Sequence, residues 1–284
     1  MVKVAFQGKL GAYSESACLH LYGADCKLFP MPEFEDVFDA VKTGLVDYGV
    51  LPVENSTTGS IHQNFDLMLK YRLPIVREVK LQIEHALLAP IGTTIKELTG
   101  IRSHPQALAQ CSLFFKKHPK IKALPDFDTA GSAEICAQEN GKIGAIASEL
   151  AAEEYGLDVL ATNLENQNDT NFTRFLSFTT KNEPSNHKNL KTSIILIPKV
   201  NQPGSLYSSL GVFAKNNIDL LKIESRPKLG SPWQYTFYID FVGTPESPQV
   251  ESALKTLSQN CEEILVLGCY PIGDDKKLFT QRKA

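Results

Sequence analysis

Several kinds of chemistry are missing from this sequence before any motif is considered. No two of its six cysteines form a Cys-x-x-Cys pair, and its six histidines are scattered without the spacing of zinc ligands. We therefore expect no metal site and reduced, mostly buried thiols of the kind found in cytoplasmic proteins. The cysteines in question are Cys18, Cys26, Cys111, Cys136, Cys261 and Cys269.

Long apolar runs and an excess of one charge are also missing. No stretch approaches the roughly 18–20 apolar residues that span a bilayer. The start of the chain has no apolar region before a cleavage site, so we expect no secretory signal and a cytoplasmic location. The formal net charge of −3 gives no electrostatic case for nucleic acid or an anionic membrane as a partner.

Nucleotide-binding loops are absent as well. The turn GKLG at residues 8–11 is not a GxGxxG fingerprint, and there is no GxxxxGK[ST] loop. Residue spacing supports neither a Ser-His-Asp nor a Cys-His arrangement. What remains is a site that works without a cofactor, built from amides, hydroxyls and an arginine.

The chain has the composition of a soluble globular protein with two domains. It contains 284 residues, of which 43% are hydrophobic and 21% charged. Up to Thr180, short apolar runs alternate with helical patterns, which predicts an α/β open sheet built from βαβ units. The expected strands are 2–6, 48–51, 101–103 and 143–147, and the expected helices begin at Ser14, Phe34, Pro105 and Ser148. Thr94 and Glu97 have capping-box spacing.

A polar linker at 181–190 leads to a different pattern over residues 191–272. Expected strands at 192–200, 220–226, 233–242 and 262–270 combine with helices at 203–216 and 248–259. This βαββαβ order predicts an α+β ferredoxin-like domain. Leu206, Leu210 and Phe213 should form the core face of the first helix, and strand 233–242 should be buried on one side. We expect the charged tail, 273–284, to be frayed.

Four polar clusters in the first domain lie where strands end and helices begin: 8–15, 52–60, 103–106 and 168–175. Ligands bind at such places in open α/β sheets, and helix N-termini there favour anions. Arg174 could bind a carboxylate through two N–H groups, and Thr173 would offer a hydroxyl beside it.

Each cluster also has a purely structural interpretation, and the residues alone leave both open. Residues 8–14 could be a tight turn with Ser14 as a helix cap, and Glu54–Ser56 a turn with local side-chain bonds. His104 could cap the helix that Pro105 begins. Residues 168–175 could be a loop that enters a strand through Asx turns.

Five motifs, which occur in this order in a known family, favour the ligand-site interpretation by resemblance. PVENSTTGSI (52–61), SHPQALAQC (103–111), NFTRF (171–175), GSLYSSL (204–210) and IESRP (223–227) resemble those of monofunctional prephenate dehydratases with a C-terminal ACT domain. The resemblance implies conversion of prephenate to phenylpyruvate in L-phenylalanine biosynthesis. It also implies a two-lobed catalytic domain at 1–180, similar to periplasmic binding proteins, with the site between the lobes, and an ACT regulatory domain at 191–272.

The same resemblance implies which residues act. The catalytic set is Thr173, Arg174, Phe175, Asn55, Ser56, Ser103 and Gln106, and substrate binding is expected at Gly11, Ser14 and Asn171. L-Phenylalanine, the expected allosteric inhibitor, should bind at Pro203, Gly204, Ser205, Leu206, Asp219, Glu224, Ser225, Arg226 and Pro227. Asp219 and Ser205 depart from the Asn and Ala usual in the family. A homodimer or homotetramer through the ACT and catalytic domains is expected, with no mutase segment ahead of Val2.

Prephenate loses a carboxylate as CO₂ and a hydroxyl as water, which makes its ring aromatic and needs no redox cofactor. We expect Arg174 and helix N-termini to bind carboxylate and Thr173 to donate a hydrogen bond to the leaving hydroxyl. A threonine hydroxyl is too weak an acid for ordinary proton transfer near pH 7, so it would act by stabilising charge. Two alternatives stay open: arogenate dehydratase, and a sensor protein without catalysis.

Overall fold

The computed structural model describes residues 1–139, 142–166, 170–181, 183, 187–199, 203–228, 230–231 and 233–279. They divide into two compact units. The first contains Met1–Ser60, Val79–Phe175 and the chain from Asp274 onward; the second contains Ile61–Glu78 and Leu176–Gly273. Residues 61–78 thus group with the second unit, although we expected them in the first domain. Residues 182 and 184–186 of the expected linker lie outside the described residues, as do 168 and 169 of the fourth polar cluster.

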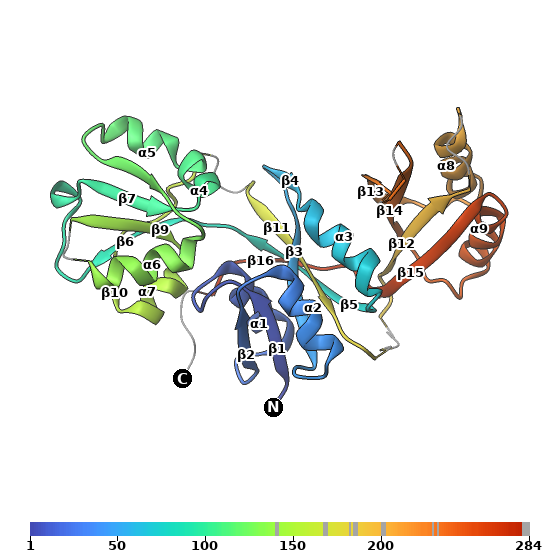
Figure 1. Ribbon diagram of the computed structural model, residues 1–284, viewed down its shortest axis with the longest axis horizontal. Coiled ribbons are helices and arrows are strands. Elements are labelled where there is room, and N and C mark those ends of the chain that lie inside the picture. Colours follow the sequence, from blue (N-terminus) through green and yellow to red (C-terminus); the bar gives the residue numbers. More distant parts are fainter. Residues whose placement is uncertain are drawn as a thin grey trace. The chain divides into compact units, whose positions relative to one another are not determined.

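The first sheet has the strand order β2-β1-β3-β11-β5-β16, with β4 paired to β3 (Figure 1). Its strands are β1 (Lys3–Gln7), β2 (Lys27–Met31), β3 (Tyr48–Asn55), β4 (Gly59–Ser60), β5 (Ile75–Gln82), β11 (Phe172–Phe178) and β16 (Asp275–Lys276). β1 runs parallel to both β2 and β3, which follow helices α1 (Tyr13–Tyr22) and α2 (Phe34–Lys42). The predicted βαβ units are confirmed, and their core includes Val4, Phe6 and Val50, all fully buried.

The second sheet of the first unit has the order β10-β6-β9-β7-β8. Its strands are β6 (Ala86–Pro90), β7 (Gly100–Ser103), β8 (Lys122–Pro125), β9 (Ile143–Ala147) and β10 (Leu157–Ala161). β7 is parallel to β8 and β9, whereas β6 is antiparallel to β9 and β10, so the sheet is mixed.

Helices cover both faces of this second sheet. Because side chains alternate along a strand, Leu88 packs with α6 (Thr129–Gln138) and α7 (Glu149–Tyr155). Its neighbour Leu87 packs with α4 (Pro105–Gln110) and α5 (Ser112–Lys117). α4 begins two residues after β7, so its start lies beside the carboxyl end of that strand.

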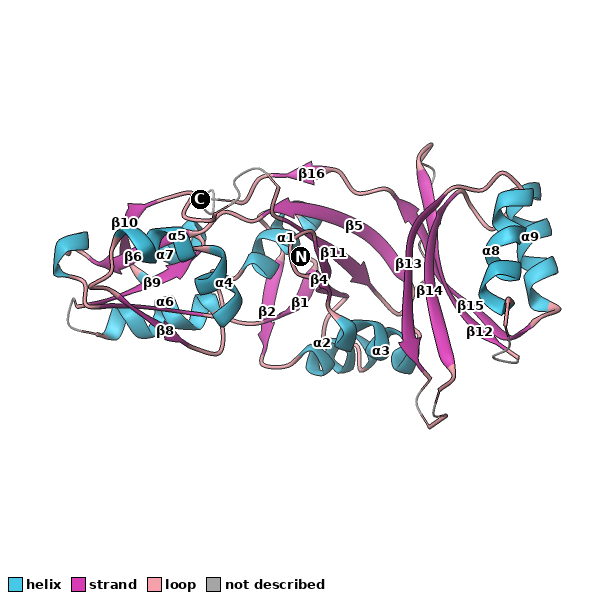
Figure 2. Ribbon diagram, turned by 90° about the horizontal axis from the view of Figure 1, so that it is seen from above, coloured by secondary structure: helices cyan, strands magenta, loops and turns pink. Residues whose placement is uncertain are grey.

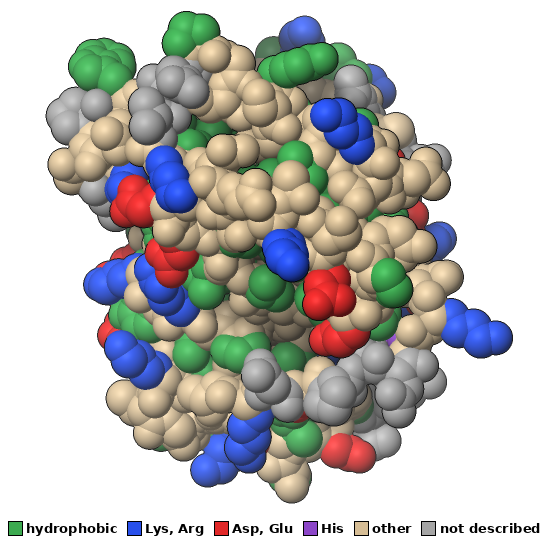
Figure 3. All heavy atoms as spheres, turned by 90° about the vertical axis from the view of Figure 1, so that its right-hand side faces the viewer, with side chains coloured by type: hydrophobic (Ala, Val, Ile, Leu, Met, Phe, Trp, Pro, Cys, Tyr) green, Lys and Arg blue, Asp and Glu red, His purple; other side chains and the backbone are tan. Residues whose placement is uncertain are grey.

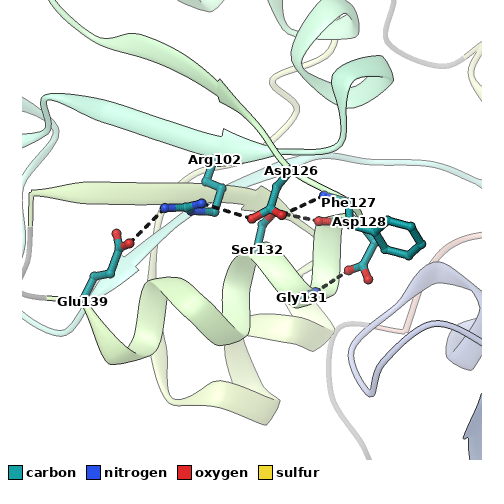
Figure 4. Close-up of polar contacts among 7 residues, drawn as sticks. All are labelled: Arg102, Asp126, Phe127, Asp128, Gly131, Ser132 and Glu139. Atoms are coloured by element: carbon teal, nitrogen blue, oxygen red, sulfur yellow. Dashed lines mark hydrogen bonds and ion pairs between the residues drawn. The ribbon is translucent and has the colours of Figure 1, made fainter. Parts of the chain in front are cut away.

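Arg102 of β7 ties together the two ends of α6 (Figure 4). Its guanidinium lies 3.3 Å from Asp126 Oδ2, just before α6, and 3.0 Å from Glu139 Oε1, just after it. Asp128 caps α6 by accepting the N–H of Gly131. The helix is thereby fixed on the sheet at both termini.

The second unit contains an antiparallel sheet of order β13-β14-β12-β15. Helices α8 (Ser205–Lys215) and α9 (Pro248–Ser258) lie on the same side of it (Figure 2). The strands are β12 (Leu190–Pro198), β13 (Leu220–Pro227), β14 (Tyr235–Val242) and β15 (Cys261–Pro271). The predicted ferredoxin-like βαββαβ order is confirmed. The face of the molecule seen in Figure 3 shows Lys and Arg side chains interspersed with Asp and Glu, so neither sign dominates it.

Two details of the second unit were predicted wrongly. Leu206 is 36% exposed because it stands at the start of α8, while Phe213 deeper in the helix is 1% exposed. Trp233 lies outside β14 in a left-handed turn (φ 64°) and is 82% exposed. Both faces of β14 are buried in its middle: Ile239 packs in the core, and Tyr238 on the opposite side donates to the Phe65 carbonyl at 2.7 Å.

The expectation of a frayed C-terminal tail is wrong for residues 274–279. β16 pairs in parallel with β5, and the Phe279 N–H donates to Ser16 Oγ at 2.9 Å. His20 also contacts the Phe279 ring at 4.4 Å between centroids. These contacts hold the segment against α1 and β5 of the first unit.

Gly11 is predicted to be irreplaceable for stability. Its φ is +84°, and an added Cβ would lie 2.6 Å from Ala151 Cα. We expect Gly11→Ala to lower the free energy of unfolding by about 2–4 kcal/mol through strain and overlap, measured by urea denaturation. Gly156→Ala is the matched control, because φ there is +66° with no atom near the added Cβ, and it should lose only about 1–2 kcal/mol. Equal losses in the two variants would contradict the packing role of Gly11.

Candidate functional site

A cavity of about 290 Å³ opens in the first unit, lined by helix α4 and by segments that connect the strands. Its wall consists of Thr57, Thr58, Gln106, Ala109, Gln110, Glu165, Asn166 and Asn171. The threonines follow β3, Ala109 and the two glutamines lie on α4, and the other three residues precede β11. The cavity therefore sits where β3 and β7 end, the ligand position typical of open α/β sheets. Its size is at the lower end of small-molecule sites.

Asn55, at the end of β3, is the hub of a hydrogen-bond network beside this cavity. Its Nδ2 donates to Asn171 Oδ1 at 2.8 Å and to Thr173 Oγ1 at 3.0 Å. Its Oδ1 accepts the N–H groups of Thr57 and Thr58, each at 3.0 Å. One buried amide, 6% exposed, thus fixes the β3 turn against the start of β11.

The network continues to the second sheet through Thr58. Gln106 Nε2 on α4 donates to Thr58 Oγ1 at 2.7 Å. Ser56 adds a further clamp: its Oγ donates to the Thr170 carbonyl at 2.6 Å and accepts the Phe172 N–H at 2.8 Å. The predicted clusters 52–60, 103–106 and the described part of 168–175 therefore meet at one place.

The last three residues of the NFTRF motif, Thr173, Arg174 and Phe175, have three different environments. Thr173 is 8% exposed, and its oxygen accepts from Asn55; among the described residues none accepts its hydroxyl proton. The Arg174 side chain is 11% exposed, and its Nη1 lies 3.7 Å from Glu54 Oε2. Phe175 is 1% exposed and belongs to the core of the first sheet, so it supports the site by packing.

Of the ten expected catalytic and substrate-binding residues, Gln106 and Asn171 line the cavity, and three others, Ser103, Gly11 and Ser14, also lie outside the hydrogen-bond network of Asn55. Ser103 is fully buried, and its Oγ donates to the Ile146 carbonyl at 2.6 Å, which joins β7 to β9. The Gly11 carbonyl accepts from Ser148 Oγ at 2.6 Å, and its N–H donates to Glu15 Oε2 at 2.7 Å. Ser14 does not cap α1, because that helix begins at Tyr13.

Residue-by-residue sequence reasoning missed Gln110 and Glu165, two polar residues of the wall. Gln110 follows Gln106 by four positions, the spacing that places two side chains on one helix face, so it could have been found. Glu165 is 7% exposed and accepts the His85 N–H at 2.9 Å. No local sequence pattern identifies Glu165 or His85 as site residues, because the two residues meet only in the folded chain.

Two of the expected effector residues in the second unit are held by helix α3 (His62–Tyr71). Arg226 Nε and Nη2 donate to the two carboxylate oxygens of Asp66 at 3.1 and 2.7 Å. Glu224 Oε1 lies 3.3 Å from His62 Nε2. The two residues of β13 are thereby tied to the first two turns of α3.

The other expected effector residues lie on the surface side of their elements. Pro203 and Gly204 form the turn before α8, and Gly204 has φ 87°. Ser205 begins α8, and the Asp219 carbonyl accepts the Val242 N–H at 2.9 Å. Ser225 and Pro227 flank Arg226 in β13, and both lie on the exposed face of this strand.

The described residues contain no candidate for two other kinds of site, a membrane-spanning helix and a metal-binding cluster. None of their helices has the length and apolar character that a bilayer-spanning helix needs. Nor does any group of three or more His, Cys, Asp and Glu side chains within this described part form a metal-binding arrangement.

Comparison with known proteins identifies clear relatives. A family model described as prephenate dehydratase matches residues 4–183. Arogenate dehydratase/prephenate dehydratase 2, chloroplastic, from Arabidopsis thaliana is 43% identical over 282 residues, which cover 95% of this chain and 73% of that protein. Prephenate dehydratase in complex with L-Phe from Arthrobacter aurescens superposes with a TM-score of 0.89 at 29% identity, covering 99% and 93% of the chains. A structure described as GqqA, a novel type of quorum quenching acylases, has a TM-score of 0.86 at 33% identity, covering 95% and 98%.

The Asn55 hub generates a stability prediction. Asn55→Ala removes the amide that pairs with four partners, so we expect the free energy of unfolding to fall by about 2–3 kcal/mol. Thr57→Ala is the control: its backbone N–H, not its exposed side chain, bonds to Asn55, and it should change stability by less than about 0.5 kcal/mol. Urea denaturation measures both, and an Asn55→Ala value as small as the control would exclude the hub role.

Proposed function

Because the chain belongs to the prephenate dehydratase family, we propose that it catalyses the decarboxylating dehydration of prephenate to phenylpyruvate, CO₂ and water. The observation that carries this proposal is the link from Thr173 through Asn55 to a cavity lined by amides and hydroxyls. The family match over residues 4–183 confirms the resemblance for the three motifs inside that range, 52–61, 103–111 and 171–175.

Thr173 is suited to stabilising the leaving hydroxyl. Because Asn55 Nδ2 donates to Thr173 Oγ1, the threonine is oriented as an acceptor toward Asn55 and as a donor elsewhere. The donated bond from Asn55 also polarises the hydroxyl, which strengthens the bond that it donates in turn. We assign this donor to the departing oxygen of prephenate, an effect of roughly 3–4 kcal/mol by analogy with single oxyanion donors.

Arg174 is assigned to a substrate carboxylate. Prephenate carries two negative charges, and a guanidinium binds carboxylate through paired N–H bonds. An acidic group already lies beside Arg174, because its Nη1 is 3.7 Å from Glu54 Oε2. Gln106 and Asn171, both in the cavity wall, supply further polar contacts.

A second candidate is arogenate dehydratase activity. Arogenate carries an ammonium group where prephenate has a keto group. Two observations favour it: the Arabidopsis relative is named for both substrates, and Glu165 places a carboxylate in the cavity wall. A carboxylate would attract the ammonium group of arogenate, a charge that prephenate lacks.

A product assay with both substrates tests the proposal. We expect the purified protein to form phenylpyruvate from prephenate, which is measured by the absorbance of this product. Activity on arogenate is measured by the release of L-phenylalanine. We expect kcat/KM to be higher for prephenate than for arogenate. Thr173→Val should lower kcat roughly 10²–10³-fold while leaving the fold intact. Thr173→Ser, which keeps the hydroxyl, should retain most of the activity.

Preference for arogenate would select the second candidate. Absence of product from either substrate would reject both and would leave a sensor role. Equal kcat for Thr173→Val and the unmodified protein would remove Thr173 from catalysis.

We further propose that L-phenylalanine binds the second unit and inhibits the enzyme. The Arthrobacter aurescens relative is described as a complex with L-Phe, and the motifs 204–210 and 223–227 carry the expected binding residues. The Arg226–Asp66 pair supports a coupling, because α3 begins at His62, directly after β4 and Ile61. The turn before β4 holds Thr57 and Thr58 of the cavity wall.

Asp66→Asn tests this regulatory proposal. The effector carboxylate would compete with Asp66 for the guanidinium of Arg226, so removing the Asp66 charge should favour effector binding. We expect the half-inhibitory concentration of L-phenylalanine to fall roughly fivefold, which corresponds to about 1 kcal/mol for a partly exposed pair, with unchanged kcat in its absence. Gln63→Ala, an exposed change on the same helix, should leave inhibition unaltered. An unchanged or higher half-inhibitory concentration in Asp66→Asn would contradict the competition.

The assembly and location of the protein are also proposals. We propose a cytoplasmic homodimer or homotetramer, as the family resemblance implies. Strand β13 ends the sheet order of the second unit, and its Leu221 and Ile223 are 45% and 43% exposed, which suits pairing with a second copy.

A further inference from the structure

A hydrogen-bonded chain of three side chains lies behind the cavity wall. Tyr13 Oη is 2.6 Å from His85 Nδ1, and His85 Nε2 is 2.8 Å from Gln110 Oε1. The tyrosine and imidazole rings meet edge to face, with centroids 5.7 Å apart. His85 is 3% exposed, whereas Gln110 lines the cavity.

The partners determine which imidazole nitrogen carries the proton. Gln110 Oε1 can only accept, so His85 Nε2 must donate to it. In a neutral imidazole Nδ1 then accepts, and Tyr13 donates its single hydroxyl proton to Nδ1 at 2.6 Å rather than to the Glu84 carbonyl at 3.3 Å. The alternative, with Nδ1–H donating to Tyr13, would require Gln110 to turn its NH₂ group toward His85.

The surroundings favour the neutral ring. Burial lowers the pKa of His85, and burial raises the pKa of Tyr13 well above its usual value. Three nearby titratable groups, Cys111, Glu165 and Glu84, add to the rise that burial causes in the Tyr13 pKa. Glu165 also accepts the His85 backbone N–H, burial raises the pKa of Cys111 to about 12, and Glu149 lines a small cavity with His85.

We propose that Tyr13 and His85 are positioning residues that hold the Gln110 amide with its NH₂ group facing the cavity. No described residue accepts from this NH₂ group, which leaves its donors to an oxygen of the substrate. The His85 backbone N–H holds Glu165 in the same wall, so one buried residue orients two cavity groups. The role of Gln110 toward substrate rests on the proposed dehydratase function, whereas the state of His85 does not.

NMR of the protein labelled with ¹⁵N-histidine tests the resting state directly. We expect the signals of His85 to be those of the Nε2–H form, and His85→Gln identifies them by their loss. A neutral Nδ1–H form, or a protonated ring near pH 7.5, would overturn the proposal. This result is independent of any activity, so it stands or falls separately from the proposed function.

Kinetics of three variants test the consequence. In Tyr13→Phe the neutral ring can exchange its proton between the two nitrogens, so Gln110 turns in part of the molecules and kcat falls severalfold. Protonating His85 restores an Nε2–H, so the kcat of this variant relative to the unmodified enzyme should rise as the pH falls through the lowered pKa of His85. A loss that is the same at every pH would indicate a merely structural role.

Two substitutions of His85, His85→Leu and His85→Gln, test whether His85 acts through its hydrogen bond to Gln110. Leu removes the donor to Gln110, and kcat should fall roughly 10²-fold, the usual effect of losing one oriented donor. Gln places an NH₂ group near the former Nε2 and should recover most of that loss. Equal losses in the two variants, both folded by circular dichroism, would reject the positioning role. If the unmodified protein converts neither substrate, the proposed function fails, and the NMR result alone decides the His85 assignment.

Discussion

The candidate site depends on the hydrogen bonds of one side-chain amide, that of Asn55. It uses its NH₂ group toward Asn171 and Thr173 and its oxygen toward the backbone of Thr57 and Thr58. A charged or purely accepting side chain could not satisfy both sets of partners at once. Through this single group, the end of β3 determines where β11 begins and where the cavity threonines stand. The hydroxyl of Thr173 acquires its direction from the same bond.

The fold could be predicted well where periodicity reflects burial on one face. Strand β1, helix α2 and the βαββαβ order of the second unit follow from such patterns. The capping box of Thr94 and Glu97 is present, yet it starts only a three-residue 3-10 helix, because a cap specifies a beginning and not a length. Alternation through Trp233 predicts a strand there, whereas the turn before β14 gives this residue a positive φ. Similarly, the Leu206 stripe was extended one turn beyond the buried part of α8.

The candidate site could be predicted in part. Three polar clusters converge because the carboxyl ends of β3 and β7 and the start of β11 meet, and the α/β pattern implies that geometry. Ser103 and Gly11 look like site residues in sequence, but their polar groups hold one strand to another and α1 to α7. Conversely, His85 and Glu165 stand in no motif. Their role depends on one backbone N–H and two side-chain distances that only the folded chain defines.

An effector bound to the second unit must favour one conformation by binding it more tightly, and that preference needs a physical route to the cavity. Chain continuity offers two. One runs from Arg226 and Asp66 along α3 into the turn that contains Thr57 and Thr58. The other is β5, whose Glu78 pairs with Lys191 at 0% and 4% side-chain exposure. Because breaking a buried ion pair leaves an uncompensated charge, the first half of β5 is firmly held in the second unit. The opposite end of β5 lies three residues before His85, whose imidazole orients Gln110 of the cavity wall in our proposal. The strand that Glu78 anchors in the second unit therefore leads directly to this wall.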